Sequence, residues 1–270
     1  VYTMGVDVGA AAAKCIVLKN GTEISGYAVI PAGIGTSGPK KAMEAAINHA
    51  GISRDSLACT VATGYGRNLI ADAKYTLSEL SCHVSGVYAS FPQAKTVIDI
   101  GGQDVKVLHI GSDGQLGEFL MNDKCAAGTG RFLEVMARVL ELDIHTMEET
   151  GRGATAPVKI SSTCTVFAES EVISQLAANA DISNLVAGIH ASVAVKAASL
   201  ARRLGLVPPV VMTGGVALNG GVVAALEKEL ALPILVSPIA QLNGAYGAAI
   251  WAWRKLIRDR KVGVANGSVK

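Results

Sequence analysis

The chain has 270 residues, of which 50% are hydrophobic, 17% charged and only 4% aromatic, and its formal net charge is +2. A disordered chain would need less apolar content and more net charge, so disorder is excluded. The near-neutral balance, without a dense Lys/Arg run, argues against nucleic acid as a partner. Five cysteines, an odd number, do not predict a disulfide framework. The composition therefore predicts a cytoplasmic α/β protein with free, catalytic or metal-bound cysteines.

No membrane partner is expected. The longest apolar region, residues 185–204, is interrupted by His190, Lys196, Arg202 and Arg203. The first seven residues have the pattern of a core strand and lack the positive flank of a signal peptide.

The chain contains the same pattern twice. Apolar runs at 2–8, 15–18 and 23–30 are joined by a small-residue turn and then by Asn20-Gly21, which is a strong hairpin signal. A second series begins at 96–102 and continues through 105–110 and 116–120, with Asp113-Gly114 at its hairpin. Each series passes into helical patterns, one beginning near Pro39 and one near Arg131.

The repeat predicts two related α/β domains with a ligand cleft between them. We expect an N-terminal half over residues 1–94, a C-terminal half over 95–260, and a frayed tail over 261–270.

Each repeat places an aspartate at the end of a strand, Asp7 and Asp99, with a glycine two residues later. Glycine lets the backbone approach a phosphate closely, and the amides of such a turn bind anions. Carboxylates in these positions would hold Mg²⁺, largely through water. One Asp-x-Gly is usually only a turn, but two at equivalent places in a duplicated pattern predict phosphate binding.

A third glycine pair, Gly214-Gly215, follows an apolar strand pattern and precedes a helical pattern at 221–230. A helix beginning there could direct its amides at a nucleotide. Together the three elements resemble the phosphate-1, phosphate-2 and adenosine motifs of the actin/Hsp70/hexokinase superfamily. The resemblance implies two actin/Hsp70/ribonuclease-H-like domains with ATP bound in the interdomain cleft, and it suggests that Gln241 lies near the nucleotide.

The first turn departs from that superfamily, which usually carries Ser or Thr after Asp-x-Gly. Its phosphate-binding candidates are Gly9, Ala10, Ala11, Ala12, Ala13 and Lys14. Only backbone amides and the lysine are available there, so we expect slow hydrolysis. The candidates in the second turn are Gly101, Gly102 and Gln103. Gln103 and Asp104 are the polar groups best placed to orient or deprotonate an attacking water, and they are the predicted catalytic residues.

Two cysteines precede helical patterns. Cys125 lies in a small-residue segment, and Cys164 follows Ser161-Ser162-Thr163. The helix dipole favours a thiolate at a helix N-terminus, and iron–sulfur clusters require thiolates. Spacing alone nevertheless favours two small buried hydrophobes, because no Cys-x-x-Cys occurs.

Resemblance reverses that judgement. The segments 79–83, 97–107, 121–132 and 160–175 resemble the activators of 2-hydroxyacyl-CoA dehydratases, in the BadF/BadG/BcrA/BcrD ATPase family. The resemblance implies a homodimer that shares one [4Fe-4S] cluster, ligated by Cys125 and Cys164 of each subunit. It also implies reduction by ferredoxin or flavodoxin, and ATP hydrolysis that drives one low-potential electron to the dehydratase.

Two other functions remain open. A sugar or amino-sugar kinase of the same fold would leave both cysteines without a role. A binding protein of the Hsp70 or actin kind would use ATP to control a partner without redox chemistry. The sequence does not distinguish an activator of a dehydratase from one of a related acyl-CoA reductase, nor does it identify the acyl group or the electron donor.

Overall fold

The computed structural model describes the backbone of residues 1–161 and 164–267, with side chains as far as Arg260. The chain forms two compact units. Unit 1 contains residues 1–92, 112–116 and 242–270, and unit 2 contains residues 93–111 and 117–241. The C-terminal segment therefore groups with the N-terminal unit and not with the expected second half, 95–260.

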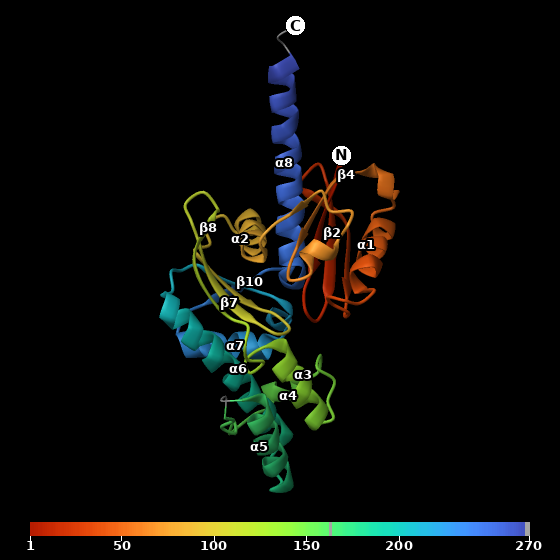
Figure 1. Cartoon of the computed structure of the whole chain (residues 1–270). Coiled ribbons are helices and arrows are strands. Elements are labelled where there is room, and N and C mark those ends of the chain that lie inside the picture. The colour runs from red at the N-terminus through yellow and green to blue at the C-terminus, as the bar shows by residue number, and fades with distance from the viewer. Residues whose placement is uncertain (162–163, 268–270) are drawn as a thin grey trace. The chain divides into compact units, whose positions relative to one another are not determined.

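Unit 1 is a five-stranded mixed sheet with helices on both faces (Figure 1). Its elements are β1 (Tyr2–Val8), β2 (Ala13–Lys19), β3 (Glu23–Ile30), α1 (Gly38–His49), β4 (Leu57–Thr63), β5 (Tyr75–Thr76), α2 (Glu79–Ser90) and α8 (Asn243–Gly267). The strand order is β3-β2-β1-β4-β5.

The two faces of this sheet follow from alternation along β1. Met4, Val6 and Val8 share a buried apolar cluster with α1. Gly5 points the other way, and a Cβ there would stand 1.9 Å from the Ala245 carbonyl oxygen of α8. A glycine in β1 therefore lets α8 lie directly on the sheet, which is why the C-terminal helix belongs to unit 1. Because α8 continues to Gly267, the expected frayed tail is helical over 261–267, and residues 268–270 lie outside the described residues.

Unit 2 repeats the topology, with strand order β8-β7-β6-β9-β10. Its elements are β6 (Thr96–Ile100), β7 (Val105–Ile110), β8 (Leu116–Asn122), α3 (Gly130–Val139), α4 (Met147–Arg152), α5 (Thr165–Ala177), α6 (Ile182–Leu204), β9 (Val210–Thr213), α7 (Gly220–Leu230) and β10 (Ile234–Val236). In both units the first strand, β1 or β6, pairs antiparallel with its hairpin partner, β2 or β7. On its other side it pairs parallel with β4 or β9. The predicted duplication is confirmed.

Helix α6 is the main core helix of unit 2. Its buried face includes Leu185, Ile189, Val193 and Ala197, which pack into the cluster that also holds Phe132 of α3. By length and hydropathy alone, α6 is the one helix among the described residues that passes as a membrane span, but 67% of its apolar window is buried inside the protein, as in any core helix.

The hairpin signals are also confirmed. Asn20 and Gly21 both have positive φ, 53° and 79°, as a type I′ turn requires. Gly114 has φ 76°, and a Cβ there would stand 2.3 Å from the Tyr88 ring.

Gly188→Ala tests how closely α6 is packed. Alanine usually stabilises a helix interior by about 0.5–1 kcal/mol over glycine. Here the new Cβ would stand 1.9 Å from the Val158 carbonyl oxygen, a backbone atom that cannot rotate away. We expect the overpacking to dominate and to lower the free energy of unfolding by about 2 kcal/mol in urea titrations. Ala191→Val, at an exposed position of the same helix, should change it by less than about 1 kcal/mol. A stabilised Gly188→Ala variant would contradict this packing.

Candidate functional site

The two strand-end aspartates occupy equivalent positions in atomic detail. In unit 1, Asp7 pairs across the ladder with Lys14, and the Lys14 Nζ lies 3.1 Å from the Asp7 Oδ2. In unit 2, Asp99 pairs with Lys106 in the same register, and the corresponding distance is 3.3 Å. Each intervening turn is closed by one hydrogen bond, from the Gly9 amide to the Ala12 carbonyl (3.0 Å) and from the Gly101 amide to the Asp104 carbonyl (2.9 Å).

The Asp7 carboxylate is almost completely buried, with 2% of the residue exposed. Its Oδ1 has no hydrogen-bond partner among the described residues. Two glycines approach it closely: a Cβ at Gly64 would stand 2.6 Å from Oδ1, and one at Gly244 would stand 3.1 Å from Oδ2. A buried carboxylate oxygen without a partner is costly. The chemistry of this donor fits Mg²⁺, which binds through one or two carboxylates and keeps several waters.

Asp99 lies in a larger buried network. Thr213 donates to its Oδ1 at 2.7 Å, while Lys106 contacts both Asp99 Oδ2 and, at 2.7 Å, Asp104 Oδ1. Lys106 is only 1% exposed. One ammonium between two carboxylates leaves these three groups with a net negative charge, which suits an additional cation. The sequence analysis missed Lys106, although its seven-residue spacing from Asp99 repeats that of Lys14 from Asp7.

The two predicted catalytic residues have different environments. Gln103 is exposed, whereas Asp104 is buried and its carboxylate binds Lys106. Asp104 therefore holds Lys106 in place, and a role as the base would compete with that contact. Gln103 remains the predicted residue for orienting water.

The first turn offers fewer amides than expected. Ala13 is not in the turn but in β2, fully buried in the core of unit 1, and the Gly9 amide is already bonded to Ala12. Ala10, Ala11 and Ala12 therefore carry the amides that remain to bind a phosphate. The turn is fixed from outside by the Ile34 amide, which donates to the Gly9 carbonyl at 3.0 Å.

The second turn is fixed to α3. The amides of Gly130 and Arg131, at the start of that helix, donate to the carbonyls of Gly101 (2.9 Å) and Gly102 (2.8 Å). The first amides of α3 are thus satisfied by the turn itself.

Gly214 and Gly215 lie beside this network. Gly214 has φ 90°, and a Cβ there would stand 2.2 Å from the Ile100 carbonyl oxygen, so only glycine allows β9 to turn at this point. The Gln241 amide group lies 3.5 Å from where a Cβ at Gly215 would stand. The structure therefore brings Gln241 to the glycine pair.

The N-terminus of α7 differs from the expectation. Its cap residue Asn219 accepts from the Val222 amide, and Glu148 of α4 accepts from the Gly220 amide at 2.9 Å. Two of the amides at this helix start, those of Gly220 and Val222, are therefore already bonded within the chain. This contact lowers the pKa of Glu148, chiefly through the Gly220 amide and also through Arg152.

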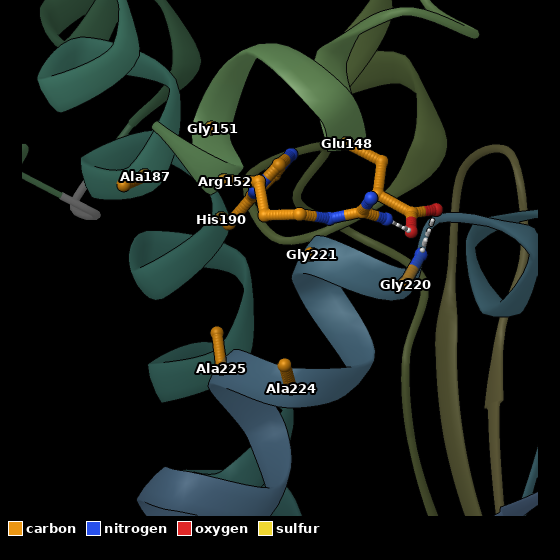
Figure 2. Close-up of a pocket in the computed structure, with 9 residues that line it drawn as sticks. All are labelled: Glu148, Gly151, Arg152, Ala187, His190, Gly220, Gly221, Ala224 and Ala225. Carbon is orange, nitrogen blue, oxygen red and sulfur yellow. Dashed lines mark hydrogen bonds and ion pairs between the residues drawn. The ribbon is translucent and has the colours of Figure 1, made fainter. Parts of the chain in front are cut away.

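A cavity of about 390 Å³ lies between α4, α6 and α7 (Figure 2). Glu148, Arg152 and His190 are its polar residues, and the rest of the lining is small: Gly151, Ala187, Gly220, Gly221, Ala224 and Ala225. Because the Asn219 Oδ1 accepts from the Val222 amide, its Nδ2 is the group that faces His190 Nε2 at 3.3 Å. His190 Nε2 must then be the acceptor, so the proton is on Nδ1. Burial lowers the pKa of His190 to about 4, against the opposing effect of Glu148.

The five cysteines fall into two classes. Cys15, Cys59 and Cys82 are buried, and burial raises the pKa of each thiol, that of Cys82 to about 12. Cys125 and Cys164 are half-buried. Cys164 is the N-cap residue of α5, in extended conformation, and Cys125 precedes α3 by five residues. Ser162 and Thr163 of the Cys164 segment lie outside the described residues.

Comparison with known sequences gives close matches over almost the whole chain. The sequence model of the BadF/BadG/BcrA/BcrD ATPase family matches residues 4–252. The (R)-2-hydroxyglutaryl-CoA dehydratase activating ATPase of Acidaminococcus fermentans is 53% identical over 256 residues, which cover 94% of this chain and 98% of that protein. The 2-hydroxyisocaproyl-CoA dehydratase activator of Clostridioides difficile is 49% identical over 260 residues, which cover 96% and 98%. The activator of lactoyl-CoA dehydratase of Anaerotignum propionicum is 51% identical over 252 residues, which cover 93% and 97%.

Solved structures agree. The activator of the 2-hydroxyisocaproyl-CoA dehydratase from Clostridium difficile, with bound ADPNP, superposes with a TM-score of 0.95 at 49% identity, covering 97% of each chain. A ROK family glucokinase from Streptomyces griseus superposes with a TM-score of 0.58 at 14% identity, covering 94% of this chain and 100% of that one, which shows the fold alone. The predicted α/β fold of the actin/Hsp70/sugar-kinase type is confirmed.

Lys106→Met tests the buried network of unit 2. The change removes the cation between two buried carboxylates, and breaking such a group typically costs about 3–5 kcal/mol. We expect a loss of that size in the free energy of unfolding, measured by chemical denaturation. Lys40→Met, at a side chain that is 78% exposed, should cost less than about 0.5 kcal/mol. A cost for Lys106→Met no larger than this control would show that the network does not need its cation.

His190 predicts an acid-dependent loss of stability. Its pKa is about 4 in the folded protein and about 6.5 when unfolded, so the unfolded chain binds the extra proton first as the pH falls. Stability should therefore decrease from pH 6.5 to pH 4, by up to about 3 kcal/mol from this residue, and stay level above pH 6.5. We expect His190→Gln to lose this part of the pH dependence in denaturation series. An unchanged slope between pH 4 and 6.5 would contradict it.

Proposed function

The chain belongs to the BadF/BadG/BcrA/BcrD ATPase family, and from this we propose that it is an ATP-hydrolysing activator of a 2-hydroxyacyl-CoA dehydratase. In this function it receives one electron from ferredoxin or flavodoxin and passes it to the dehydratase while ATP becomes ADP and phosphate. The relatives are named for 2-hydroxyglutaryl-, 2-hydroxyisocaproyl- and lactoyl-CoA, so the proposal stops at the 2-hydroxyacyl class.

The two turns supply the nucleotide chemistry. The amides at 10–12 and the Lys14 ammonium would bind phosphate oxygens. The proposed Mg²⁺ residues are Asp7, whose Oδ1 has no hydrogen-bond partner in the described part of the chain, and Asp99. Gln103 would orient the attacking water, and Gly214, Gly215 and Gln241 would contact the nucleoside. The absence of hydroxyls in the first turn still predicts slow turnover.

The chemistry of the donor set supports a [4Fe-4S] cluster. Three of the five thiols are buried with raised pKa values, which disfavours the thiolate. Cys125 and Cys164 are the accessible pair. When bound, the cluster supplies a one-electron centre of low potential. Two thiolates per chain make half of the four ligands that it needs, so the site is complete only in a symmetric dimer.

The surface of α5 supports that dimer. Immediately after Cys164, Val166 and Phe167 are 64% and 68% exposed, and Ile173 is 51% exposed two turns later. Apolar side chains of this size beside one another mark a contact surface. A second copy of the chain, brought there by the shared cluster, would cover them.

The proposal is supported chiefly by the hydrogen bonds and helix packing that link the turn at Gly101 and Gly102 to the segments of Cys125 and Cys164. The carbonyls of Gly101 and Gly102 hold the start of α3, which is preceded by the Cys125 segment. Helix α3 packs against α5, whose cap residue is Cys164, and the helices α3, α4 and α5 lie together at one end of unit 2 (Figure 1). A change in the turn on nucleotide binding would therefore move the residues that hold the cluster, and cluster surroundings set its potential.

A kinase of the same fold is the alternative. The likeness to the glucokinase is at the level of fold only, and a kinase has no use for Cys125 and Cys164.

Anaerobic purification with iron and sulfide analysis tests the proposal. We expect about four irons per dimer, a brown chromophore and a particle of twice the chain mass. Cys125→Ala and Cys164→Ala should each abolish the bound iron, whereas Cys59→Ala, at a buried position, should retain it. ATP hydrolysis that persists in an iron-free, monomeric protein after anaerobic reconstitution would reject the redox function, and a screen of sugar acceptors would follow.

A further inference from the structure

Helix α5, which begins directly after its cap residue Cys164, is sparsely packed. Of its 13 residues, Ala168 and Val172 are the buried ones, whereas 12 of the 23 residues of α6 are buried. A helix in a protein is held in place mainly by the apolar face that it buries. The direction of α5, and with it the position of Cys164, therefore depends strongly on the few other contacts that this helix makes.

The chain between α4 and α5 is held firmly to α6. The Asn184 Oδ1 accepts from the amides of Thr155 (2.9 Å) and Ala156 (2.8 Å), and the Val158 amide donates to the Asn184 carbonyl at 3.0 Å. Ile160 is 6% exposed and belongs to the apolar core cluster of unit 2. This stretch is therefore a fixed part of the unit.

A hydrogen bond connects the end of that stretch to α5. The Glu171 Oε2 accepts from the Ser161 amide at 2.6 Å. Ser161 lies three residues before Cys164, and Glu171 lies seven residues after it. The bond thus joins the chain that leads into Cys164 to the helix that leads away from it. A hydrogen bond from an amide to a carboxylate is roughly twice as strong as one between neutral groups.

The Ser161 amide does not depend on this acceptor. Ser161 is exposed, so water could accept from its amide almost equally well. Glu171 is half-buried and lies on the same face of α5 as Ala168, three residues earlier. Because water could replace the carboxylate as an acceptor but could not connect the two segments, the main consequence of the contact is geometric.

We propose that Glu171 is a positioning residue for the Cys164 thiolate. By holding the Ser161 amide it fixes the start of α5 relative to the core of unit 2, and so fixes the direction in which Cys164 is presented to the iron–sulfur cluster. The inference rests on the proposed function and goes beyond it, because it assigns a role in cluster binding to a residue that is not itself a ligand of iron.

The expected effect follows from how such partners act on metal sites. Residues that orient a ligand without binding the metal typically contribute about 10- to 100-fold to metal affinity. Removing Glu171 should therefore weaken retention of the cluster while all the proposed ligands remain. A variant that keeps an acceptor oxygen at this position should restore most of the effect.

The first test is loss of the cluster from the anaerobically reconstituted full chain in the presence of an iron chelator, followed by the visible absorption. We expect Glu171→Ala to lose iron about tenfold faster than the wild type. Glu171→Gln, whose amide oxygen can still accept from Ser161, should stay within about threefold of the wild type. Glu169→Ala removes a carboxylate two residues earlier in the same helix and is the matched control.

The second test observes the contact itself in the cluster-free chain. Amide hydrogen exchange reports local opening, and a hydrogen-bonded amide exchanges more slowly than a free one. The Ser161 amide should exchange several-fold faster in Glu171→Ala than in the wild type or in Glu171→Gln. Glu169→Ala should leave its exchange unchanged.

The outcomes distinguish this inference from the proposed function. If the reconstituted wild type holds no iron, the redox function fails and the positioning role fails with it. If the wild type holds its cluster and Glu171→Ala releases iron no faster, the positioning role alone is wrong. Two further results would also overturn it: iron loss from Glu171→Gln as fast as from Glu171→Ala, and faster exchange throughout unit 2 with a lower melting temperature, which would identify general destabilisation.

Discussion

A buried aspartate at the end of a strand, paired with a lysine directly across the hairpin, occurs once in each half of this protein. Everything proposed for the nucleotide depends on it, because a carboxylate that is 2% exposed needs a permanent partner. The lysine takes one oxygen and fixes the direction of the other. In unit 1 the second oxygen of Asp7 has no hydrogen-bond donor within the part of the chain that the structure describes, while in unit 2 the second oxygen of Asp99 accepts from Thr213. The two halves thus differ: the first leaves one carboxylate oxygen for the cation that we propose, and the second forms a buried hydrogen-bonded network beside its turn.

At the first site, absent side chains let the backbone approach the carboxylate closely. Gly64 and Gly244 lie far apart in the sequence, yet each would place a Cβ within about 3 Å of the Asp7 carboxylate. The close approach of α8 to β1 at Gly5 depends on the same principle. Because α8 both packs on β1 and supplies Gly244 beside Asp7, the surroundings of this carboxylate are complete only when the helix lies on the sheet.

The sequence predicted what depends on local chemistry. The repeated strand–turn–strand pattern, the Asn20-Gly21 hairpin and both strand-end aspartates could be recognised because each is encoded within a few residues. The features that the sequence did not predict depend on contacts between residues far apart in the chain. Nothing near residue 243 indicates that α8 returns to the N-terminal sheet, and nothing near Gly220 indicates that Glu148 already occupies the start of α7. The buried ion pair of Lys106 could have been predicted from its seven-residue spacing to Asp99. The hydrogen bond between Asn243 and His83 could not, because the two residues lie far apart in the sequence.

The hydrogen bond between the Gly220 amide and Glu148 helps to fix the position of residues 125–164, the segment that contains both Cys125 and Cys164. Among the described residues, hydrogen bonds join the segment 125–164 to the proposed nucleotide-binding elements at two places. The amides at the start of α3 donate to the Gly101 and Gly102 carbonyls, and Glu148 of α4 accepts from the Gly220 amide, five residues after Gly215. Two attachment points define a direction as well as a distance, so the segment cannot simply swing about one hinge. In the proposed function, a displacement of the Gly101–Gly102 turn would therefore act directly on α3 and through it on α5, which packs on α3 and begins after its cap residue Cys164. Because hydrogen bonds and packed helices have discrete arrangements, such a connection transmits a change of state and does not dissipate it as a small strain.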